Sequence, residues 1–266
     1  MKELIFVKLG GSLITVKEIP FTENKKVINH LAKEIHRVRK KRKLKLLVGH
    51  GGGSFPHVPA AKYQTDLGII NEESYRGISE VQDAASRLNR IVVSALMKAG
   101  ENTMSVQASS SCIAENFKIV DFYTKPIKKL LDYGMVPVIY GDVGIDLKRG
   151  CCILSTEEIF SFLAKKLKPS KIIFAGLVDG VFDADPQKNM DARLIKKITP
   201  KGYSKIKKLL SGSSGIDVTG GMSHKVEKMV ELARIGIKTQ IINGSVKGNL
   251  EKALLGDENI GTLIFP

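Results

Sequence analysis

The feature that most constrains the fold is an alternation of short β-branched runs with longer segments of helical period. The runs occur at 4–9, 44–49, 103–107, 136–140, 171–175, 239–243 and 262–265. Most are continuously apolar, as expected for parallel strands that are buried on both faces. Strands that alternate with helices predict an α/β protein, a three-layer αβα sandwich with a mostly parallel central sheet.

Two of the intervening segments have a clear helical pattern. Over 72–99, apolar side chains recur every three or four residues and form one stripe. A second helix is expected over 222–234, where Gly236 follows as a C-terminal cap. Between 143 and 154 the pattern changes to a hairpin that turns near 148–150, which is a candidate flap over a substrate.

Length and composition indicate one compact unit. The chain has 266 residues, enough for one large domain or two tightly joined lobes, and no linker rich in Pro, Gly or Ser separates them. If there are two lobes, we expect an N-terminal lobe at 1–168 and a C-terminal lobe at 169–266. No apolar run reaches the roughly 20 residues that cross a bilayer, and the chain begins on a strand pattern rather than a leader. We therefore expect a cytoplasmic protein without a membrane partner.

The remaining composition concerns metals and partners. The three cysteines have neither a metal-binding spacing nor a disulfide framework, so we expect reduced thiols and no metal ligands from the chain. The net charge of +15 is compatible with nucleic-acid binding, with attraction of small anions, or with a merely basic surface. Its densest part, 37–45, closes an amphipathic helix and has no interleaved aromatic residues. Nucleic acid is therefore not the expected partner.

Glycine clusters that follow predicted strands carry the chemical information, because parallel sheets bind ligands beyond the carboxyl ends of their strands. The first cluster is Lys8-Leu9-Gly10-Gly11-Ser12. Glycine lets backbone amides approach phosphate oxygens, and the lysine supplies a mobile cation. A plain tight turn would also explain this cluster. It is not a Walker P-loop, because the lysine precedes the glycines.

The second cluster contains Gly51, Gly52 and Gly53, and it also follows an apolar strand. Consecutive glycines are costly in chain entropy, and a backbone nest for an anion explains why they are present. His57 lies just beyond, where a helix could begin, and its ring N–H could point at the same anion. For His50, at the strand end, we expect a structural role with hydrogen bonds to the backbone.

Two further clusters lie later in the chain. A glycine pair, Gly220 and Gly221, leads into a helix with Lys225 one turn in, and such a helix start favours negative charge. The loop around Asp179 follows the strand 171–175 and could hold a nucleotide, although Asp-Gly turns are also common without a ligand.

Taken in order, these clusters resemble the amino-acid-kinase superfamily, and most closely its isopentenyl phosphate kinases. The resemblance runs from Leu4 to about Thr262 and includes Val136-Pro-Val-Ile-Tyr-Gly-Asp142 and Asp217-Val-Thr-Gly-Gly-Met222. Its most discriminating element is His57, because this second histidine after the glycine loop is found in the isopentenyl phosphate and fosfomycin kinases but not in acetylglutamate or uridylate kinases. The chain departs from the family pattern at Pro56, at Thr156-Glu157 and at Gly176-Leu177.

The resemblance implies an ATP- and Mg²⁺-dependent kinase that converts isopentenyl phosphate to its diphosphate, with the acceptor in the N-terminal lobe and the nucleotide in the C-terminal lobe. It also implies a homodimer. The implied catalytic residues are Lys8, Lys17, His57, Glu157 and Lys225. The implied nucleotide site contains Gly10, Gly11, Ser12, Asp179, Gly220 and Gly221. The implied acceptor site contains Gly51, Gly52, Gly53, His57, Asp142, Ile145, Ile153 and Thr156.

Two other functions stay open from the sequence. One is a kinase of the same family that acts on another small phosphate or phosphonate, such as fosfomycin. The other is a non-catalytic nucleotide-binding or RNA-binding protein, which the charge of +15 would suit.

Overall fold

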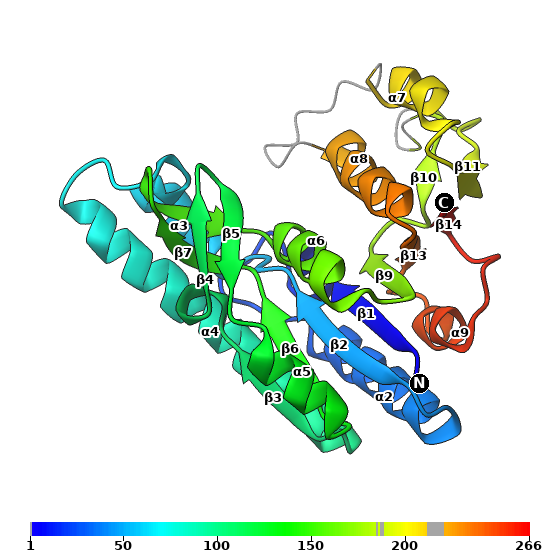
Figure 1. The fold of residues 1–266 in the computed structure, drawn as a ribbon. Helices are drawn as coiled ribbons and strands as arrows, with labels where there is room; N and C mark the ends of the chain where they lie inside the picture. Colours follow the sequence, from blue (N-terminus) through cyan, green and yellow to red (C-terminus); the bar gives the residue numbers. More distant parts are fainter. Residues whose placement is uncertain (1, 185, 187–188, 212–220) are drawn as a thin grey trace.

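The fold is centred on an eight-stranded sheet with the strand order β12-β14-β13-β9-β1-β2-β6-β3. Figure 1 shows it in a computed structural model that describes residues 2–184, 186, 189–211 and 221–266. Every neighbouring pair in this sheet is parallel except β13 with β14. The predicted α/β fold with a mostly parallel central sheet is therefore confirmed.

The strands of this sheet follow the apolar runs closely. Their bounds are β1 Leu4–Leu9, β2 Lys45–His50, β3 Thr103–Val106, β6 Val136–Tyr140, β9 Lys171–Gly176, β12 Lys197–Ile198, β13 Lys238–Asn243 and β14 Thr262–Ile264. Each predicted strand is present to within one residue at either end. The sequence analysis missed only β12, which is too short to show a pattern.

Helices cover both faces of the sheet, which gives the predicted three layers (Figure 1). One face packs on α1 (Gly11–Ile14), α2 (Lys25–Lys41), α4 (Glu73–Ala99) and α9 (Asn249–Leu255). The other packs on α5 (Lys125–Asp132), α6 (Thr156–Leu167) and α8 (Gly221–Arg234), with α7 (Tyr203–Ser211) beside α8. Along β1, Ile5 and Val7 enter one core and Phe6 the other, because successive strand residues face opposite sides.

Local signals fix where the helices begin and end. The side chain of Asn24 caps α2 by accepting the N–H of Val27 at 3.3 Å, and Ser155 caps α6 by accepting the N–H of Glu158 at 3.1 Å. After α8, Gly236 has a φ of +86° and donates its N–H to the carbonyl of Ala233, as expected for a glycine cap.

A smaller, four-stranded sheet lies beyond the carboxyl end of β6. Its order is β5-β4-β7-β8, with β4 Cys112–Glu115, β5 Lys118–Phe122, β7 Asp142–Asp146 and β8 Gly150–Leu154. The predicted hairpin is the β7–β8 pair, whereas its partner hairpin β4–β5 was not predicted. Burial raises the pKa of Asp146, but backbone N–H groups of both hairpin turns outweigh it and lower that pKa to about 2. Asp146 thereby ties the two hairpins together.

The remaining elements are short. They are α3 (His57–Tyr63), η1 (Thr65–Leu67), η2 (Ala108–Ser110), β10 (Val181–Phe182) and β11 (Leu194–Ile195). The central sheet takes β1, β2, β3 and β6 from the first part of the chain and β9, β12, β13 and β14 from the part after Ser170. The division into an acceptor lobe at 1–168 and a nucleotide lobe at 169–266 stays a prediction.

Candidate active site

The predicted clusters meet at one edge of the central sheet, because their strands are parallel and end there together. Backbone hydrogen bonds join the loops that follow these strands. They run from Gly10 N to Ala175 O (2.8 Å), Gly51 N to Leu9 O (3.0 Å), Gly141 N to His50 O (3.1 Å) and Gly244 N to Gly176 O (2.8 Å). The loops after β1, β2, β6, β9 and β13 are thus parts of one continuous rim.

The first two glycine loops are in direct backbone contact. A Cβ added at Gly11 would lie 2.4 Å from the backbone nitrogen of Gly53, and one at Gly51 would lie 2.8 Å from that of Gly11. Gly53 also has a φ of +55°, a conformation that disfavours any side chain. Only glycines let these two loops approach so closely.

Lys8 points into this rim from β1 and forms an ion pair with Glu157, the second residue of α6. Burial lowers the pKa of Lys8, and Glu157 acts against that fall. Burial raises the pKa of Glu157, but the charge of Lys8 outweighs it, so this pKa is lowered. The lowered pKa of Glu157 favours its ionised form, and the carboxylate in turn opposes the effect of burial on Lys8.

Lys225 belongs to the same electrostatic group. Its charge is felt by both partners of the pair, and it lowers the pKa of Lys8 and that of Glu157. Lys225 lies in the second turn of α8, which begins at Gly221. Gly220 lies outside the described residues, as does the Asp217-Val218-Thr219 segment before it.

His57 is the first residue of α3, directly after the second glycine loop, as predicted. It is an exposed residue, yet the surrounding protein lowers its pKa through burial first and the charge of Lys17 second. Lys17 is therefore near the imidazole. Pro56 precedes His57, and the proline ring packs closely on Gly52. A Cβ added at Gly52 would lie 2.2 Å from that ring, so position 52 requires glycine.

His50 has the structural role that was expected for it. Its Nδ1 is 3.0 Å from the carbonyl of Gly51, and its Nε2 is 3.1 Å from the amide nitrogen of Asn89. The ring stacks on Tyr140 with 5.6 Å between centroids. Burial lowers its pKa to about 4, so the ring is neutral at pH 7.

Asp142 and Thr156 lie beneath this rim and are buried. Burial raises the pKa of Asp142, whose carboxylate accepts the backbone N–H of Ser109 and of Val143. The hydroxyl of Thr156 donates to the carbonyl of His50 at 2.6 Å, which fastens the start of α6 to the second glycine loop. These contacts hold the walls of the site, and the predicted acceptor contacts of both residues stay predictions.

Ile145 and Ile153 lie on the face of the β7–β8 hairpin that packs on α4. On that face Val143 and Cys151 are buried against Val81. Ile145 and Ile153 are instead 48% and 37% exposed, so their surfaces are open to a ligand. Ile145 lies in β7, which directly follows β6, and Ile153 lies in β8, which directly precedes α6.

On the other side of the rim, Ser12 is exposed in the first turn of α1. Asp179 is exposed in the loop after β9 and accepts a hydrogen bond from the Asn243 side chain at 2.9 Å. They flank the glycine loop after β1 and the loop after β13.

The sequence analysis missed two features of this rim, the Thr15 bridge and the Asn243-Gly244 turn. The hydroxyl of Thr15 accepts the N–H of Ser54 at 3.1 Å and donates to the carbonyl of Gly11 at 2.9 Å, so it bridges the glycine loops. Nothing in the sequence marks that bridge. Asn243-Gly244, in contrast, has the same strand-then-glycine pattern as the other clusters and could have been found by it.

Within the described ranges, no three side chains among His, Cys, Asp and Glu group as a metal site. The donors at the rim are backbone amides and ammonium groups, which suit phosphate oxygens rather than a cation. The described helices also include none that is both long and apolar enough to cross a membrane.

Comparisons with known proteins agree with this geometry. Residues 3–243 match the model of the Amino acid kinase family. The chain is 36% identical to the isopentenyl phosphate kinase of Methanothermobacter thermautotrophicus over 98% of each chain, and 36% identical to that of Methanocaldococcus jannaschii over 96% of each. A solved isopentenyl phosphate kinase structure superposes with a TM-score of 0.83 and 33% identity over 98% of this chain and 99% of the other. The chain therefore belongs to the amino acid kinase family and, within it, to the isopentenyl phosphate kinases.

Proposed function

We propose that the protein transfers the γ-phosphoryl group of ATP to isopentenyl phosphate and releases isopentenyl diphosphate and ADP. The observation that carries this proposal is the Lys8–Glu157 pair, which lies at the rim where the first two glycine loops touch. Two amide-rich loops in contact, with ammonium groups beside them, suit two phosphorylated molecules placed head to head.

The acceptor needs no general base. A phosphate monoester has a second pKa of about 6, so its oxygen is already ionised at neutral pH. That oxygen forms a bond to the γ-phosphorus while the bond from the γ-phosphorus to the β,γ-bridging oxygen breaks, and ADP takes the electron pair. What the protein must supply is in-line positioning and relief of repulsion between two polyanions.

The nucleotide would lie against Gly10, Gly11 and Ser12 on one side. Asp179 would face its nucleoside, and Gly220 and Gly221 would offer amides to its phosphates. Lys8 and Lys225 would neutralise the transferring group, with Glu157 holding Lys8 in place. Support comes from the charges of both lysines, which act on the same part-buried carboxylate.

The acceptor phosphate would lie in the nest of Gly51, Gly52 and Gly53. His57 would donate a hydrogen bond to it and keep that bond as charge shifts in the transition state. Its lowered pKa favours a neutral imidazole, which remains a donor through one ring N–H. Lys17 would add a charge from the neighbouring turn.

Mg²⁺ would arrive bound to the phosphates of ATP. The described side chains fit that arrangement rather than a carboxylate-held ion, because they form no acidic metal cluster. When bound, the ion would neutralise phosphate oxygens and orient them.

The prenyl tail needs an apolar slot, for which we propose the space between α4 and the β7–β8 hairpin. The half-exposed Ile145 and Ile153 face that side, and Asp142 and Thr156 hold the hairpin and α6 beside the acceptor loop. The acceptor would thus belong to the half of the chain before Lys168 and the nucleotide to the half after it.

An RNA-binding role for the basic charge has less support. In the densest basic run, Arg37 and Lys41 pair with Glu251, Arg39 with Glu101, Arg42 with Glu3 and Lys45 with Asp132. Ammonium and guanidinium groups that already face carboxylates are poor ligands for a phosphate backbone.

A homodimer and a cytoplasmic location are part of the proposal. The long helix α4 offers surface to a second copy, since Tyr75 and Met97 are exposed on it. The three cysteines are free and buried, which suits a reducing compartment. Size-exclusion chromatography with light scattering tests the dimer.

The test of the function is a panel of acceptors with labelled ATP and Mg²⁺. We expect isopentenyl phosphate to give the highest kcat/KM, above longer prenyl phosphates, fosfomycin and inorganic phosphate. A higher kcat/KM for fosfomycin would replace the proposed acceptor with the alternative one. Absence of transfer to every acceptor, together with salt-sensitive RNA binding, would replace the proposed kinase activity with a non-catalytic RNA-binding role.

A further inference from the structure

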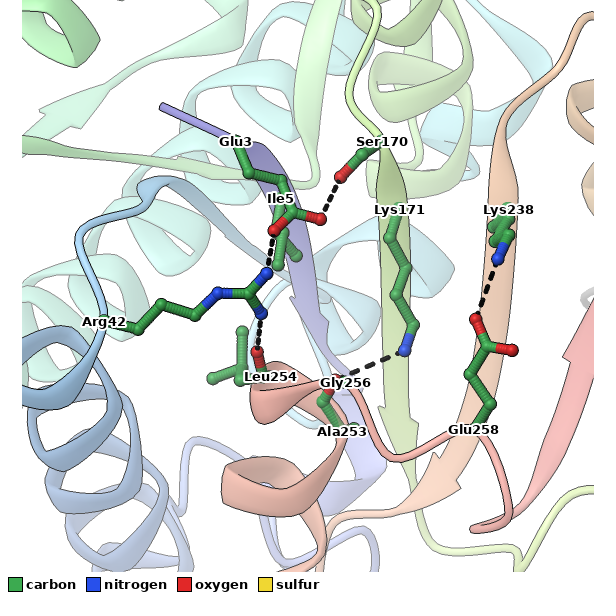
Figure 2. Close-up of a pocket in the computed structure, with 10 residues that line it drawn as sticks. All are labelled: Glu3, Ile5, Arg42, Ser170, Lys171, Lys238, Ala253, Leu254, Gly256 and Glu258. Carbon is green, nitrogen blue, oxygen red and sulfur yellow. Dashed lines mark hydrogen bonds and ion pairs between the residues drawn. The ribbon is translucent and has the colours of Figure 1, made fainter. Parts of the chain in front are cut away.

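A pocket of about 180 Å³ lies at the opposite edge of the central sheet, where β1, β9 and β13 begin (Figure 2). Its charged lining comes from Glu3, Arg42, Lys171, Lys238 and Glu258. A water molecule occupies about 30 Å³, so the volume suits a small ion with its hydration rather than a nucleotide. The pocket shares none of these residues with the catalytic rim.

Most of these charges are already matched. Glu3 accepts hydrogen bonds from the Arg42 guanidinium and, at 2.7 Å, from the hydroxyl of Ser170. Glu258 accepts one from Lys238 at 2.9 Å. Figure 2 shows these two pairs on either side of the pocket. Both carboxylates are therefore neutralised.

Lys171 is the third cation of the pocket lining and takes part in neither of these two pairs. Only 6% of it is exposed, and its Nζ donates to the carbonyl of Ala253 at 3.2 Å. Among the described residues it forms no ion pair within 4.0 Å, and two of its three N–H donors have no hydrogen-bonding partner there. Burial lowers the pKa of Lys171, although the charges of Glu258, Glu3 and Asp257 act to raise it, so the ammonium group is only partly compensated.

Helix capping explains part of this arrangement. Lys171 and Arg42 donate to the carbonyls of Ala253 and Leu254 in the last turn of α9, where the helix dipole favours cations. Capping does not explain the open volume beside the ammonium group or its two unused donors.

We propose that this pocket binds a small oxyanion of the phosphate class, held by the ammonium group of Lys171 between Arg42 and Lys238. The anion would pair directly with the ammonium group and accept the unused N–H groups. β1 is six residues long, so at roughly 3.3 Å per residue the site lies about 17 Å or more from the glycine loops. It is a second anion site, separate from those for ATP and the acceptor.

Binding at this site should depend on pH. The groups that face Lys171 are Glu3 on the β1 side, Lys238 on β13, and Asp257 and Glu258 after α9, with Arg42 across the pocket. Lys238, Arg42 and a protonated Lys171 balance the three carboxylates, whereas a neutral Lys171 would leave the site with a net negative charge. Affinity should therefore fall as pH rises through the lowered pKa of Lys171 and be highest below it.

The test uses inorganic phosphate and the full chain, with thermal unfolding and titration calorimetry at constant ionic strength set by chloride. We expect phosphate a hundredfold above its Kd to raise the unfolding midpoint by roughly 5 °C. Lys171→Met and Lys171→Gln should weaken phosphate binding at least tenfold. The matched control Lys165→Met, which removes an exposed lysine of α6, should bind phosphate as the wild type does.

A Lys8→Met variant separates this pocket from the catalytic rim. Phosphate binding that survives in Lys8→Met but is lost in both Lys171 variants would assign it to the pocket. Binding that is lost in Lys8→Met and unchanged in the Lys171 variants would assign it to the rim and overturn the proposal. No phosphate-dependent stabilisation of the wild type would also overturn it.

Discussion

His57 is the residue that best links the sequence pattern to the proposed chemistry. It begins α3 directly after the second glycine loop, and burial first and the charge of Lys17 second lower the pKa of its imidazole. A neutral donor placed at the acceptor phosphate adds a hydrogen bond without adding a charge to the site. Its contribution should thus show in turnover rather than in folding.

We expect His57→Ala to lower kcat by roughly 10² to 10³, as for the removal of other transition-state donors. The residue is exposed, so the thermal midpoint should change little. Steady-state kinetics with isopentenyl phosphate and a thermal melt measure the two effects, with Lys62→Ala on the same helix as the control. Wild-type turnover in His57→Ala would refute the assigned role.

At Glu157, a single carboxylate raises the pKa of a part-buried lysine, Lys8, against the effect of burial. Removing that charge by Glu157→Gln should lower the pKa of Lys8 further, because burial then acts on it unopposed. We expect kcat/KM to fall on the order of 10²-fold at pH 7 and the alkaline limb of the pH–rate profile to move to lower pH.

The next residue provides the matched control for that variant. Glu158 pairs with Lys228 at 2.6 Å and also lies in the first turn of α6. Glu158→Gln should keep the wild-type position of the alkaline limb. An unshifted limb in Glu157→Gln, or an equal shift in both variants, would show that the Lys8–Glu157 pair does not control this ionisation.

At the scale of elements, the site depends on the contact between the loops that follow β1 and β2. Thr15 bridges the two loops, and the hydroxyl of Thr156 ties the start of α6 to the second of them. The loops are therefore fastened to one another, and a change that separates them should affect stability and activity together.

Gly53→Ala tests the contact between these loops. Its Cβ would lie 2.2 Å from the Thr15 hydroxyl, in addition to the strain of a φ of +55°. We expect a loss of about 3 kcal/mol of unfolding free energy, of which the backbone conformation accounts for about 1. Urea unfolding and the ATP-dependent rate measure both consequences, and activity should fall at least tenfold.

Gly236→Ala is the control for backbone strain alone. Gly236 also has a positive φ, of +86°, but an added Cβ would meet nothing within 4 Å. We expect a loss of about 1 kcal/mol and nearly full activity. Equal losses in the two variants would mean that close packing of the loops is not what requires glycine at position 53.

At the scale of the whole molecule, buried ionisable groups set how stability depends on pH. His50 is buried at the carboxyl end of β2, and burial lowers its pKa from 6.5 to about 4. The unfolded chain therefore takes up this proton first as pH falls. The stability that His50 contributes is complete above pH 6.5 and is lost between pH 6.5 and about 4.

We expect this loss to amount to about 3 kcal/mol. Urea unfolding at pH 7 and pH 4 should show a smaller decrease for His50→Asn than for the wild type, by roughly that amount. His224→Asn, at an exposed histidine of α8, is the control and should follow the wild type. Parallel curves for His50→Asn and wild type would show that His50 is not the group responsible.

The sequence by itself determined every strand of the central sheet except β12, together with the long helix α4, the β7–β8 hairpin and the glycine clusters after β1, β2 and β9. These features are local: strand burial, helical period and chain reversal each leave a pattern over neighbouring residues. Parallel strands then place those clusters at one edge, so the location of the site also followed from the sequence. His57 and the Lys8–Glu157 pair were found there through the family resemblance.

Only the tertiary structure decided which groups touch across long sequence separations. It joined Thr15 to the second glycine loop, joined the β4–β5 hairpin to β7, and buried Lys171 at the far edge of the sheet, against the carbonyl of Ala253. The physical reason is that a side chain's burial and charge partners depend on where other segments pack. Residues far apart along the chain carry no local pattern that records those partners.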